Sequence, residues 1–206
     1  MIIALKIWLG FVVIVTSIYA LRHFVFAFVR LYLPQRHSFQ DVAGAYLPTV
    51  CLMVPMHNER EVVRETIAAL KRVDYPRDRF TILIVDDRST DGTSQLLDEL
   101  CADAPHIEIY HRKSGPGVIG GKPAALNEAL AMTDAEVILT FDADYWPSRD
   151  SVMRLAAPLM DPRVALTMGR VVPRNPDHNL LTRMLDLERA GGYQVNQHVR
   201  WIRAVG

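Results

Sequence analysis

The chain has 206 residues, of which 50% are hydrophobic, and this is enough for one α/β domain of about 150 residues and an anchor segment. Its 23 basic and 23 acidic residues give a net charge of zero, which argues against a basic nucleic-acid-binding protein and against an acidic disordered chain. The two cysteines, Cys51 and Cys101, have neither metal-ligand nor CxxC spacing. We expect both to be buried thiols in a reducing compartment, with a disulfide between them as the less favoured alternative.

The chain opens with an apolar segment. Ile7–Leu21 contains no charged residue, and the apolar character continues after it, with Arg22 and His23 as the only interruptions. Because about 20 apolar residues cross the hydrocarbon core of a membrane, we predict a transmembrane helix over residues 1–30. A cleaved signal peptide is the alternative, although the segment is long for one and no small-residue cleavage site follows it.

Basic residues are distributed unequally around this segment. Only Lys6 and the terminal amine precede it, whereas Arg22, Arg30 and Arg36 follow it. The positive-inside rule then places the C-terminal side in the cytoplasm, so we expect a protein of the inner cell membrane. A polar linker over residues 31–47 would join the helix to the remainder of the chain.

Strand-like and helix-like segments alternate after the linker. Short apolar runs predict strands, and apolar residues at helical spacing predict helices. The strands are expected over residues 49–54, 80–85, 107–110, 136–141 and 164–172, and the helices over residues 59–73, 93–101, 122–132 and 148–160. Apolar strands that alternate with helices indicate a mostly parallel sheet covered by helices on both faces. We therefore predict an α/β domain over residues 48–206.

Polar residues follow three of the predicted strands. They are Pro55–Glu59 after the first strand, Asp86–Thr93 after the second and Asp142–Asp144 after the fourth. Ligands of parallel sheets bind at the carboxyl ends of the strands, so we expect these residues to meet at one edge of the sheet. That edge is the predicted binding site.

Asp142-Ala-Asp144 is the most informative of these motifs. Two carboxylates one residue apart, just past a strand, can share a divalent cation, and hard oxygen ligands suit Mg²⁺ or Mn²⁺. Such an ion would bridge diphosphate oxygens and stabilise the charge on a departing nucleotide diphosphate. The alternative is a solvated acidic turn, because an isolated DxD is a common pattern.

Asp86 and Asp87 follow the second predicted strand. At this position a carboxylate can accept the imide N–H of uracil, or the amino and imino N–H groups of guanine. We expect Asp87 to have this role. Ser89 and Asp91 are expected to cap the helix that follows, and capping is also the alternative interpretation of the whole motif.

A glycine-rich loop, Gly115–Gly121, precedes Lys122. It contains GxGxxG, but it follows the third strand instead of the first, which makes it a weak dinucleotide fingerprint, and Pro123 after the lysine excludes a P-loop. We interpret it as a flexible basic loop that closes over phosphates. Lys122 would then supply a point charge at the start of a helix, where backbone N–H groups also favour anions.

Taken together, these motifs resemble those of family 2 glycosyltransferases. Pro55–Glu59, Val85–Thr93, Gly121–Asn127 and Phe141–Asp144 occur in the order and spacing of that family. The sequence looks like the membrane-bound, processive branch, which includes the cellulose, mannan, hyaluronan and poly-N-acetylglucosamine synthases.

The resemblance implies a GT-A fold, a UDP- or GDP-sugar donor, a bound Mg²⁺ or Mn²⁺ and inversion at the sugar carbon. Carried over from the family motifs, the residues that would line the nucleotide-sugar site are His57, Glu59, Asp87, Lys122 and Asp142. Asp142 and Asp144 would hold the metal ion. A glycan or a lipid would accept the hexosyl unit, and nucleic acid would not be a partner.

The C-terminal part departs from the family pattern. The family's general base is an acidic residue in a Thr-Glu-Asp-like motif, and no such motif follows Asp144. Gln197, Arg200 and Trp201 match the acceptor-binding Gln-x-x-Arg-Trp pattern, but they precede the place where the base is expected. We therefore expect this segment to be the helix before the acceptor region, and the general base to lie beyond Gly206.

The segment over residues 180–202 carries scattered arginines, a histidine and aromatic residues. It would suit either the surface of a membrane or a position on the sheet as an ordinary helix. From the sequence, both alternatives remain open.

Two other functions also remain open. Without the general base, the chain could bind nucleotide and metal without turnover. A phosphatase with a DxD nucleophile is disfavoured, because that motif usually lies on the first strand and precedes Thr or Val, whereas Tyr145 and Trp146 follow it here.

Overall fold

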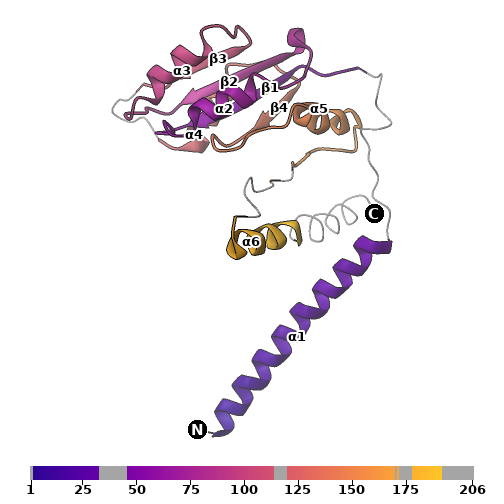
Figure 1. Ribbon diagram of the computed structural model, residues 1–206. Helices are drawn as coiled ribbons and strands as arrows, with labels where there is room; N and C mark the ends of the chain where they lie inside the picture. Colours follow the sequence, from indigo (N-terminus) through magenta and orange to yellow (C-terminus); the bar gives the residue numbers. More distant parts are fainter. Residues whose placement is uncertain (1, 33–45, 114–119, 170, 172–177, 192–206) are drawn as a thin grey trace. The chain divides into compact units, whose positions relative to one another are not determined.

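The computed structural model describes residues 2–32, 46–113, 120–169, 171 and 178–191 (Figure 1). The chain divides into two compact units, one of residues Ser38–Gly169 and one that combines Met1–His37 with Arg170–Gly206. The first unit contains the sheet and its helices. The second contains an N-terminal helix and a C-terminal helix, which we describe individually.

The N-terminal helix α1 covers Ile2–Tyr32. Its residues Ile2–Val25 form a stretch of 24 residues with a mean hydropathy of 2.2, and none of this stretch is buried within the structure. By length and composition the helix can cross a membrane, as the sequence predicts. It ends two residues beyond the predicted limit at residue 30.

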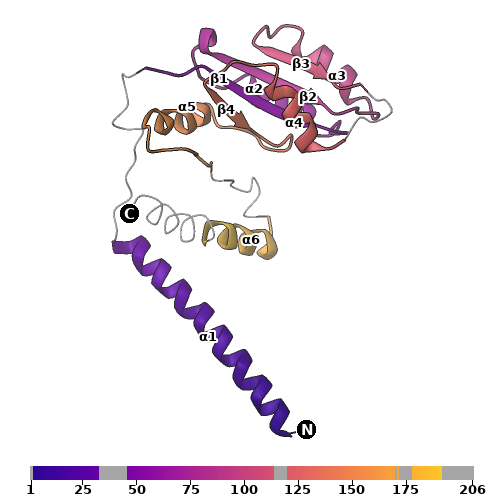
Figure 2. The same cartoon turned by 180° about the vertical axis from the view of Figure 1, so that it is seen from behind.

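The sheet has four parallel strands in the order β3-β2-β1-β4, which can be followed from both sides in Figures 1 and 2. The strands are β1 (Val50–Met56), β2 (Phe80–Asp86), β3 (Ile107–His111) and β4 (Val137–Thr140). Val50 of β1 is in register with Phe80 of β2 and with Val137 of β4, so the three strands run in parallel towards the same edge. The parallel sheet predicted from the sequence is confirmed.

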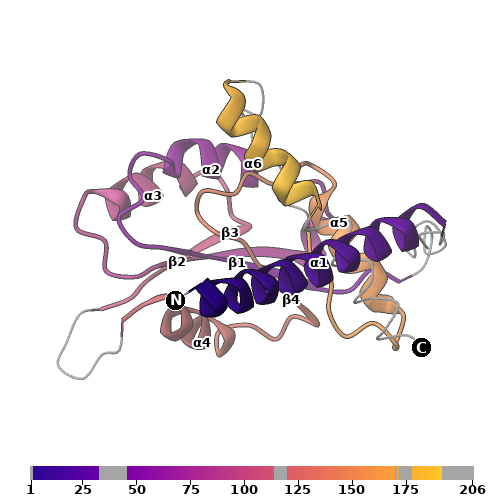
Figure 3. The same ribbon diagram turned by 90° about the horizontal axis from the view of Figure 1, so that it is seen from below.

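Helices cover both faces of the sheet, as predicted, with α2 and α3 on one face and α4 on the other (Figure 3). The helices of this unit are α2 (Val63–Leu70), α3 (Thr93–Cys101), α4 (Lys122–Leu130) and α5 (Ser151–Ala156), with short 3₁₀ turns at Arg77–Arg79 and Ala157–Met160.

Alternate residues of each strand point to opposite faces. Leu52 and Val54 therefore pack in the core formed with α2, α3 and α5, whereas Met53 packs against α4 in a second, smaller core.

The two cysteines lie on opposite faces of the sheet. Cys51 belongs to the core under α4, and Cys101, at the end of α3, belongs to the core on the other face. Both are buried free thiols, and burial raises the pKa of Cys101 to about 11. The prediction of buried thiols is confirmed, and the sheet between them explains why they do not form a disulfide.

Three predicted elements differ from the structure. The helix expected over residues 148–160 is an α-helix only over Ser151–Ala156 and continues as a 3₁₀ turn over Ala157–Met160. The helix expected over residues 59–73 begins only at Val63, because the residues before it form a turn in which the N–H of Val63 donates to the carbonyl of Glu59. The strand expected over Val164–Val172 is absent from the described residues 164–169 and 171.

The physical reason for the missing strand lies beside β4. Residues 164–167 lie next to this edge strand, but a cavity of about 320 Å³ is lined by both segments. Val164 donates instead to the carbonyl of Asp161 in a local turn. The β-branched and apolar residues of the segment 164–172 suit a pleated surface. A strand also needs a neighbouring strand to which its backbone can form hydrogen bonds, and the composition of a segment does not provide one.

The C-terminal helix α6 covers Leu180–Gly191. Asn179 precedes it and caps its first turn, since its side-chain oxygen accepts the backbone N–H of Thr182 at 2.9 Å. The apolar residues Leu181 and Leu185, four positions apart, are both exposed. Residues 192–202 lie outside the described residues, and so do Gln197, Arg200 and Trp201, so the predictions for this segment stay predictions.

Candidate functional site

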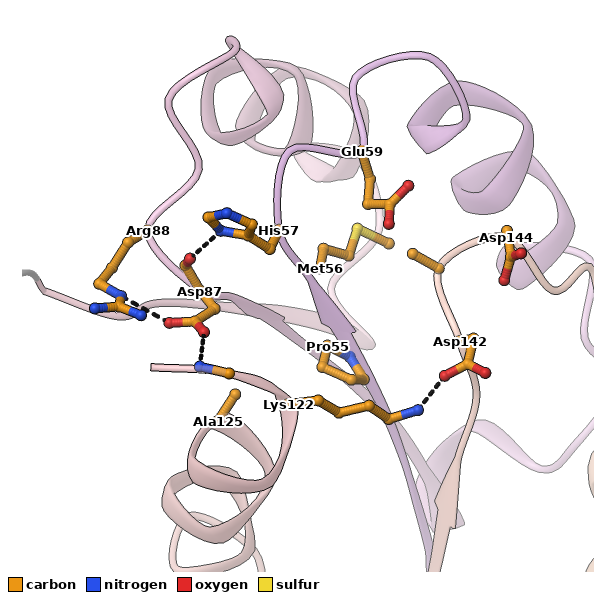
Figure 4. A pocket seen from close by; sticks show the side chains of 12 residues that line it. Pro55, Met56, His57, Glu59, Asp87, Arg88, Lys122, Ala125, Asp142 and Asp144 are labelled. Carbon is orange, nitrogen blue, oxygen red and sulfur yellow. Dashed lines mark hydrogen bonds and ion pairs between the residues drawn. The ribbon is translucent and has the colours of Figure 1, made fainter. Parts of the chain in front are cut away.

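A cavity of about 510 Å³ opens at the edge of the sheet where β1, β2 and β4 end (Figure 4). Parallel strands bring their carboxyl ends to one edge, so loops from distant parts of the sequence meet there. The structure brings all six predicted site residues to this one cavity: His57, Glu59, Asp87, Lys122, Asp142 and Asp144.

The Asp87 carboxylate, directly after β2, is buried and strongly hydrogen-bonded. Its Oδ1 accepts the Nε of Arg88 at 2.8 Å and the Nη1 of Arg112 at 2.5 Å, and its Oδ2 accepts the backbone N–H of Gly121 at 2.8 Å. Burial alone would raise the pKa of Asp87, but the hydrogen bonds from Arg88 and Gly121 and the charge of Arg112 outweigh it and lower the pKa. Asp87 is therefore an ionised group in the cavity wall.

The neighbouring Asp86 has a structural role instead. It does not line the cavity; its carboxylate accepts the hydroxyl of Ser94 at 2.5 Å, the backbone N–H of Ser89 at 3.1 Å and the ring Nδ1 of His111 at 2.8 Å. Burial would raise its pKa, but these hydrogen bonds lower it. Asp86 thus joins the loop after β2 to α3 and to the end of β3.

The loop after β2 is also tied to the loop after β1. The His57 Nδ1 lies 2.7 Å from the carbonyl oxygen of Asp87, and the Ser89 hydroxyl accepts the N–H of Asn58 at 3.0 Å. Ser89 is therefore not the helix cap that the sequence predicts. Asp91 does accept the N–H of Thr93 at 3.0 Å in the first turn of α3, although the residue at the N-cap position is Gly92.

Arg112 and Glu128 were not identified from the sequence. The Arg112 guanidinium, at the end of β3, is almost fully buried and donates from Nε and Nη2 to the two oxygens of Glu128 on α4, at 2.9 and 2.5 Å. It also contacts Asp87, so one cation connects β2, β3 and α4. In the sequence, Arg112 is marked only by its position directly after a short predicted strand. Many surface arginines occupy such positions, so this position does not indicate burial or a role in the site.

Two glycines allow α4 to approach the cavity. Gly121 has φ 96° and ψ 164°, a conformation that side-chain-bearing residues avoid, and this conformation directs its N–H to Asp87. Gly120 leaves space for the guanidinium of Arg88, which a Cβ at position 120 would contact too closely. Residues 115–119 of the predicted phosphate loop lie outside the described residues.

The Asp142–Asp144 turn is fixed by hydrogen bonds to Thr66 of α2. The backbone N–H of Tyr145 donates to the carbonyl of Asp142 at 3.0 Å, which closes the turn. The buried Thr66 hydroxyl donates to the carbonyl of Ala143 at 2.5 Å and accepts the indole Nε1 of Trp146 at 3.2 Å. Ala143 is buried, so the flanking carboxylates are presented to the cavity (Figure 4).

The charges in the cavity suit a divalent cation bound together with a diphosphate. Lys122 forms an ion pair with Asp142, while burial, Asp144 and Asp91 raise the pKa of Glu59. Among the described residues, no three His, Cys, Asp or Glu side chains form a ready metal cage. Mg²⁺ typically binds one or two carboxylates and completes its shell with phosphates and water, so Asp142 and Asp144 fit this mode of binding.

The sequence comparison identifies the family. The profile of glycosyl transferase family 2 matches residues 51–203. The chain therefore belongs to glycosyl transferase family 2, a family of enzymes, and its fold is the GT-A fold that the motifs predict.

Two curated relatives are similar over most of this chain. The β-monoglucosyldiacylglycerol synthase of Synechocystis sp. is 37% identical over 150 residues, which cover 73% of this chain and 31% of the relative. The probable glycosyltransferase YdaM of Bacillus subtilis is 33% identical over 156 residues, which cover 75% of this chain and 37% of the relative. The chain thus spans about a third of the length of these relatives.

A solved structure shares the fold. The mannosyltransferase PcManGT from Pyrobaculum calidifontis, in complex with GDP-Man and Mn²⁺, superposes with a TM-score of 0.61 at 28% sequence identity. The match covers 74% of this chain and 44% of the mannosyltransferase. That enzyme binds a nucleotide sugar and a metal ion together.

Proposed function

We propose that this protein transfers a hexosyl unit from a UDP- or GDP-sugar to a glycan or lipid acceptor, with inversion at the sugar carbon. The observation that carries the proposal is the cavity at the carboxyl edge of the sheet, in which acidic and basic side chains from β1, β2, α4 and β4 come together. Family membership and the GDP-Man and Mn²⁺ complex of the mannosyltransferase support the same assignment.

In this proposal the donor lies along the cavity with its base near Asp87 and its diphosphate near Lys122. Asp87 is ionised and so can accept a base N–H. Lys122 begins α4, where its ammonium group and the positive end of the helix dipole favour an anion. His57 and Glu59, from the loop after β1, complete the walls.

Asp142 and Asp144 would hold Mg²⁺ or Mn²⁺ against the diphosphate. When bound, the ion supplies positive charge that stabilises the departing nucleotide diphosphate. Lys122 pairs with Asp142, and the incoming phosphates would draw the lysine away from it. The negative charges of Asp144 and Asp91, which raise the pKa of Glu59, would then strengthen the binding of a cation.

The acceptor hydroxyl would attack the sugar carbon as the diphosphate leaves on the opposite side, which accounts for inversion. The relatives named β-monoglucosyldiacylglycerol synthase favour a lipid acceptor, whereas the resemblance to cellulose and mannan synthases favours a growing glycan. The residue that would take the proton of the acceptor hydroxyl is not assigned among the described residues.

We further propose that residues 1–30 anchor the protein in the inner membrane and that the catalytic domain, residues 48–206, lies on the cytoplasmic side. The support is the apolar helix α1 together with Arg22 near the end of its apolar stretch and Arg30 and Arg36 after that stretch, whereas only Lys6 lies near its start. Sugar nucleotides of the cytosol would then reach the cavity directly.

The test measures binding and transfer separately. Asp142→Asn and Asp144→Asn should each lower transfer by the complete protein about 100-fold or more, because charge stabilisation of the leaving group is lost. Both should also abolish the Mn²⁺ dependence of UDP or GDP binding in calorimetry. Full turnover by both variants in Mn²⁺ would contradict the metal assignment, and nucleotide binding by the unaltered protein with no donor consumption would favour a binding module.

A further inference from the structure

The number of hydrogen bonds that the Asp87 carboxylate already accepts limits which nucleotide base the cavity can bind. This inference rests on the proposed function, in which the Asp87 carboxylate meets the base. A carboxylate has about four lone-pair positions, two on each oxygen. Among the described residues, Arg88 and Arg112 take both positions on Oδ1, and the N–H of Gly121 takes one on Oδ2. One acceptor position therefore remains, on Oδ2.

Arg112 fixes this arrangement. Its side chain is only 1% exposed, and Glu128 accepts two of its N–H groups, so the guanidinium cannot turn away from Asp87 without breaking contacts on α4. The backbone N–H of Arg112 also donates to the carbonyl of Asp86 at 3.0 Å, which fixes the main chain beside it. Arg112 thus holds one acceptor position of Oδ1 in place, and Arg88 occupies the other.

Uracil and guanine make different demands on such a carboxylate. Uracil offers a single donor, its N3–H, which needs one acceptor position. Guanine offers two adjacent donors, N1–H and the exocyclic amine, which are satisfied together only when both oxygens of a carboxylate are available. With Oδ1 of Asp87 already accepting two hydrogen bonds, one guanine donor would be left without its partner on the carboxylate.

We propose that the donor of this protein is a uridine diphosphate sugar, and that Arg88 and Arg112 set this preference by occupying Oδ1 of Asp87. Arg112, held by Glu128, is a positioning residue, because it acts on the base through Asp87. Arg88, at the rim of the cavity, makes the second contact to the same oxygen.

The first test compares nucleotides that share the diphosphate and differ in the base. The 206-residue chain in detergent is titrated with UDP, GDP and CDP in Mn²⁺ by calorimetry. UDP should bind about 10- to 100-fold more tightly than GDP, the value of one hydrogen bond to a charged group. CDP, whose ring carries an acceptor where uracil carries N3–H, should also bind more weakly than UDP.

The second test changes the occupancy of Oδ1. Arg88 has φ 62°, a left-handed conformation that glycine adopts without strain, so Arg88→Gly should fold and should free one acceptor position. It removes a positive charge near the diphosphate and weakens all nucleotides, but the UDP-to-GDP affinity ratio should fall towards one. Arg77→Ala removes the same charge from an exposed position before β2, at the opposite edge of the sheet, and should leave the ratio unchanged.

The outcomes separate this inference from the proposed function. GDP or CDP binding as tightly as UDP, or an unchanged ratio in Arg88→Gly, overturns the assignment of uridine and leaves a nucleotide-sugar enzyme of another base preference. Binding of none of the three nucleotides in Mn²⁺ overturns the proposed function itself.

Discussion

The hydroxyl of Thr66, in the middle of α2, donates a hydrogen bond of 2.5 Å to the carbonyl of Ala143, the residue between the two aspartates of the DxD turn. Thr66 is fully buried, and the two residues are 77 positions apart in the sequence. A helix from one part of the chain thus determines how the turn after β4 presents Asp142 and Asp144.

Replacing this hydroxyl should disturb the turn. Thr66→Val keeps the shape of the side chain but leaves the carbonyl of Ala143 and the indole N–H of Trp146 without this partner. We expect the free energy of unfolding to fall by about 1–3 kcal/mol, and Mn²⁺-dependent nucleotide binding to weaken. Urea denaturation and Mn²⁺ titration measure the two effects. Thr66→Ser, which retains the hydroxyl, is the control, and Mn²⁺ affinity equal in Thr66→Val and the unaltered protein would refute this role.

Lys122 should have opposite effects on the metal ion and on the nucleotide. Lys122→Met removes the cation that pairs with Asp142, so Mn²⁺ alone should bind at least as tightly as before. UDP in the presence of Mn²⁺ should bind about 10- to 100-fold more weakly, because a charge-assisted contact to the diphosphate is lost. Calorimetry with each ligand gives both affinities.

The control for Lys122 is another lysine–aspartate pair. Lys71 pairs with Asp103 near the C-terminal ends of α2 and α3, away from the cavity lining. Lys71→Met should change neither affinity. If Lys122→Met weakens both ligands equally, the lysine has a general structural role and the proposed exchange between aspartate and phosphate is wrong.

The buried cation Arg112 should contribute strongly to stability. Arg112→Met leaves Asp87 and Glu128 without their shared partner, and loss of one member of a buried ion pair costs about 3 kcal/mol. Chemical denaturation should show this decrease. Arg163, which pairs with Asp161 on the exposed surface, is the comparison: Arg163→Ala should change stability much less, because solvent screens an exposed ion pair. Equal effects of the two substitutions would show that Arg112 does not stabilise the fold through its contacts with Asp87 and Glu128.

His111 should make stability fall as the pH rises. Burial alone would lower the pKa of His111, but hydrogen bonds with Asp86 and Asp98 outweigh it and raise the pKa above its ordinary value of 6.5. The protonated ring therefore stabilises the fold below about pH 6.5, and this contribution is lost as the pH rises through the folded-state pKa. Its size is about 1 kcal/mol or less, because the ring is partly exposed.

Urea denaturation on either side of neutral pH measures the slope. His111→Asn should remove most of it. His106 provides a control of opposite sign, since burial and the nearby Arg77 and Lys71 lower its pKa and its contribution grows as the pH rises. His106→Gln should therefore make stability fall more steeply with rising pH. An unchanged slope in His111→Asn would show that the ring is not coupled to the fold through Asp86 and Asp98.

Local patterns were sufficient to predict the sheet and much of its surroundings. The apolar runs around Leu52, Ile82 and Leu139 predicted β1, β2 and β4, because strands buried on both faces contain few polar residues. The same patterns gave a wrong prediction where a segment needed a neighbouring strand to pair with. The residues after Val164 have the composition of a strand, but the described part of this segment does not pair with β4.

The sequence by itself determined which residues arrive at the cavity, because Asp87, Lys122 and Asp142 each lie next to a strand or helix whose pattern is clear. Only the tertiary structure decided how they are used. The donors to Asp87 from Arg112 and Gly121 lie 25 and 34 positions away along the chain, and no local spacing records such contacts. Hydrogen bonds of this kind depend on strand order and helix position, which the chain acquires only when it folds.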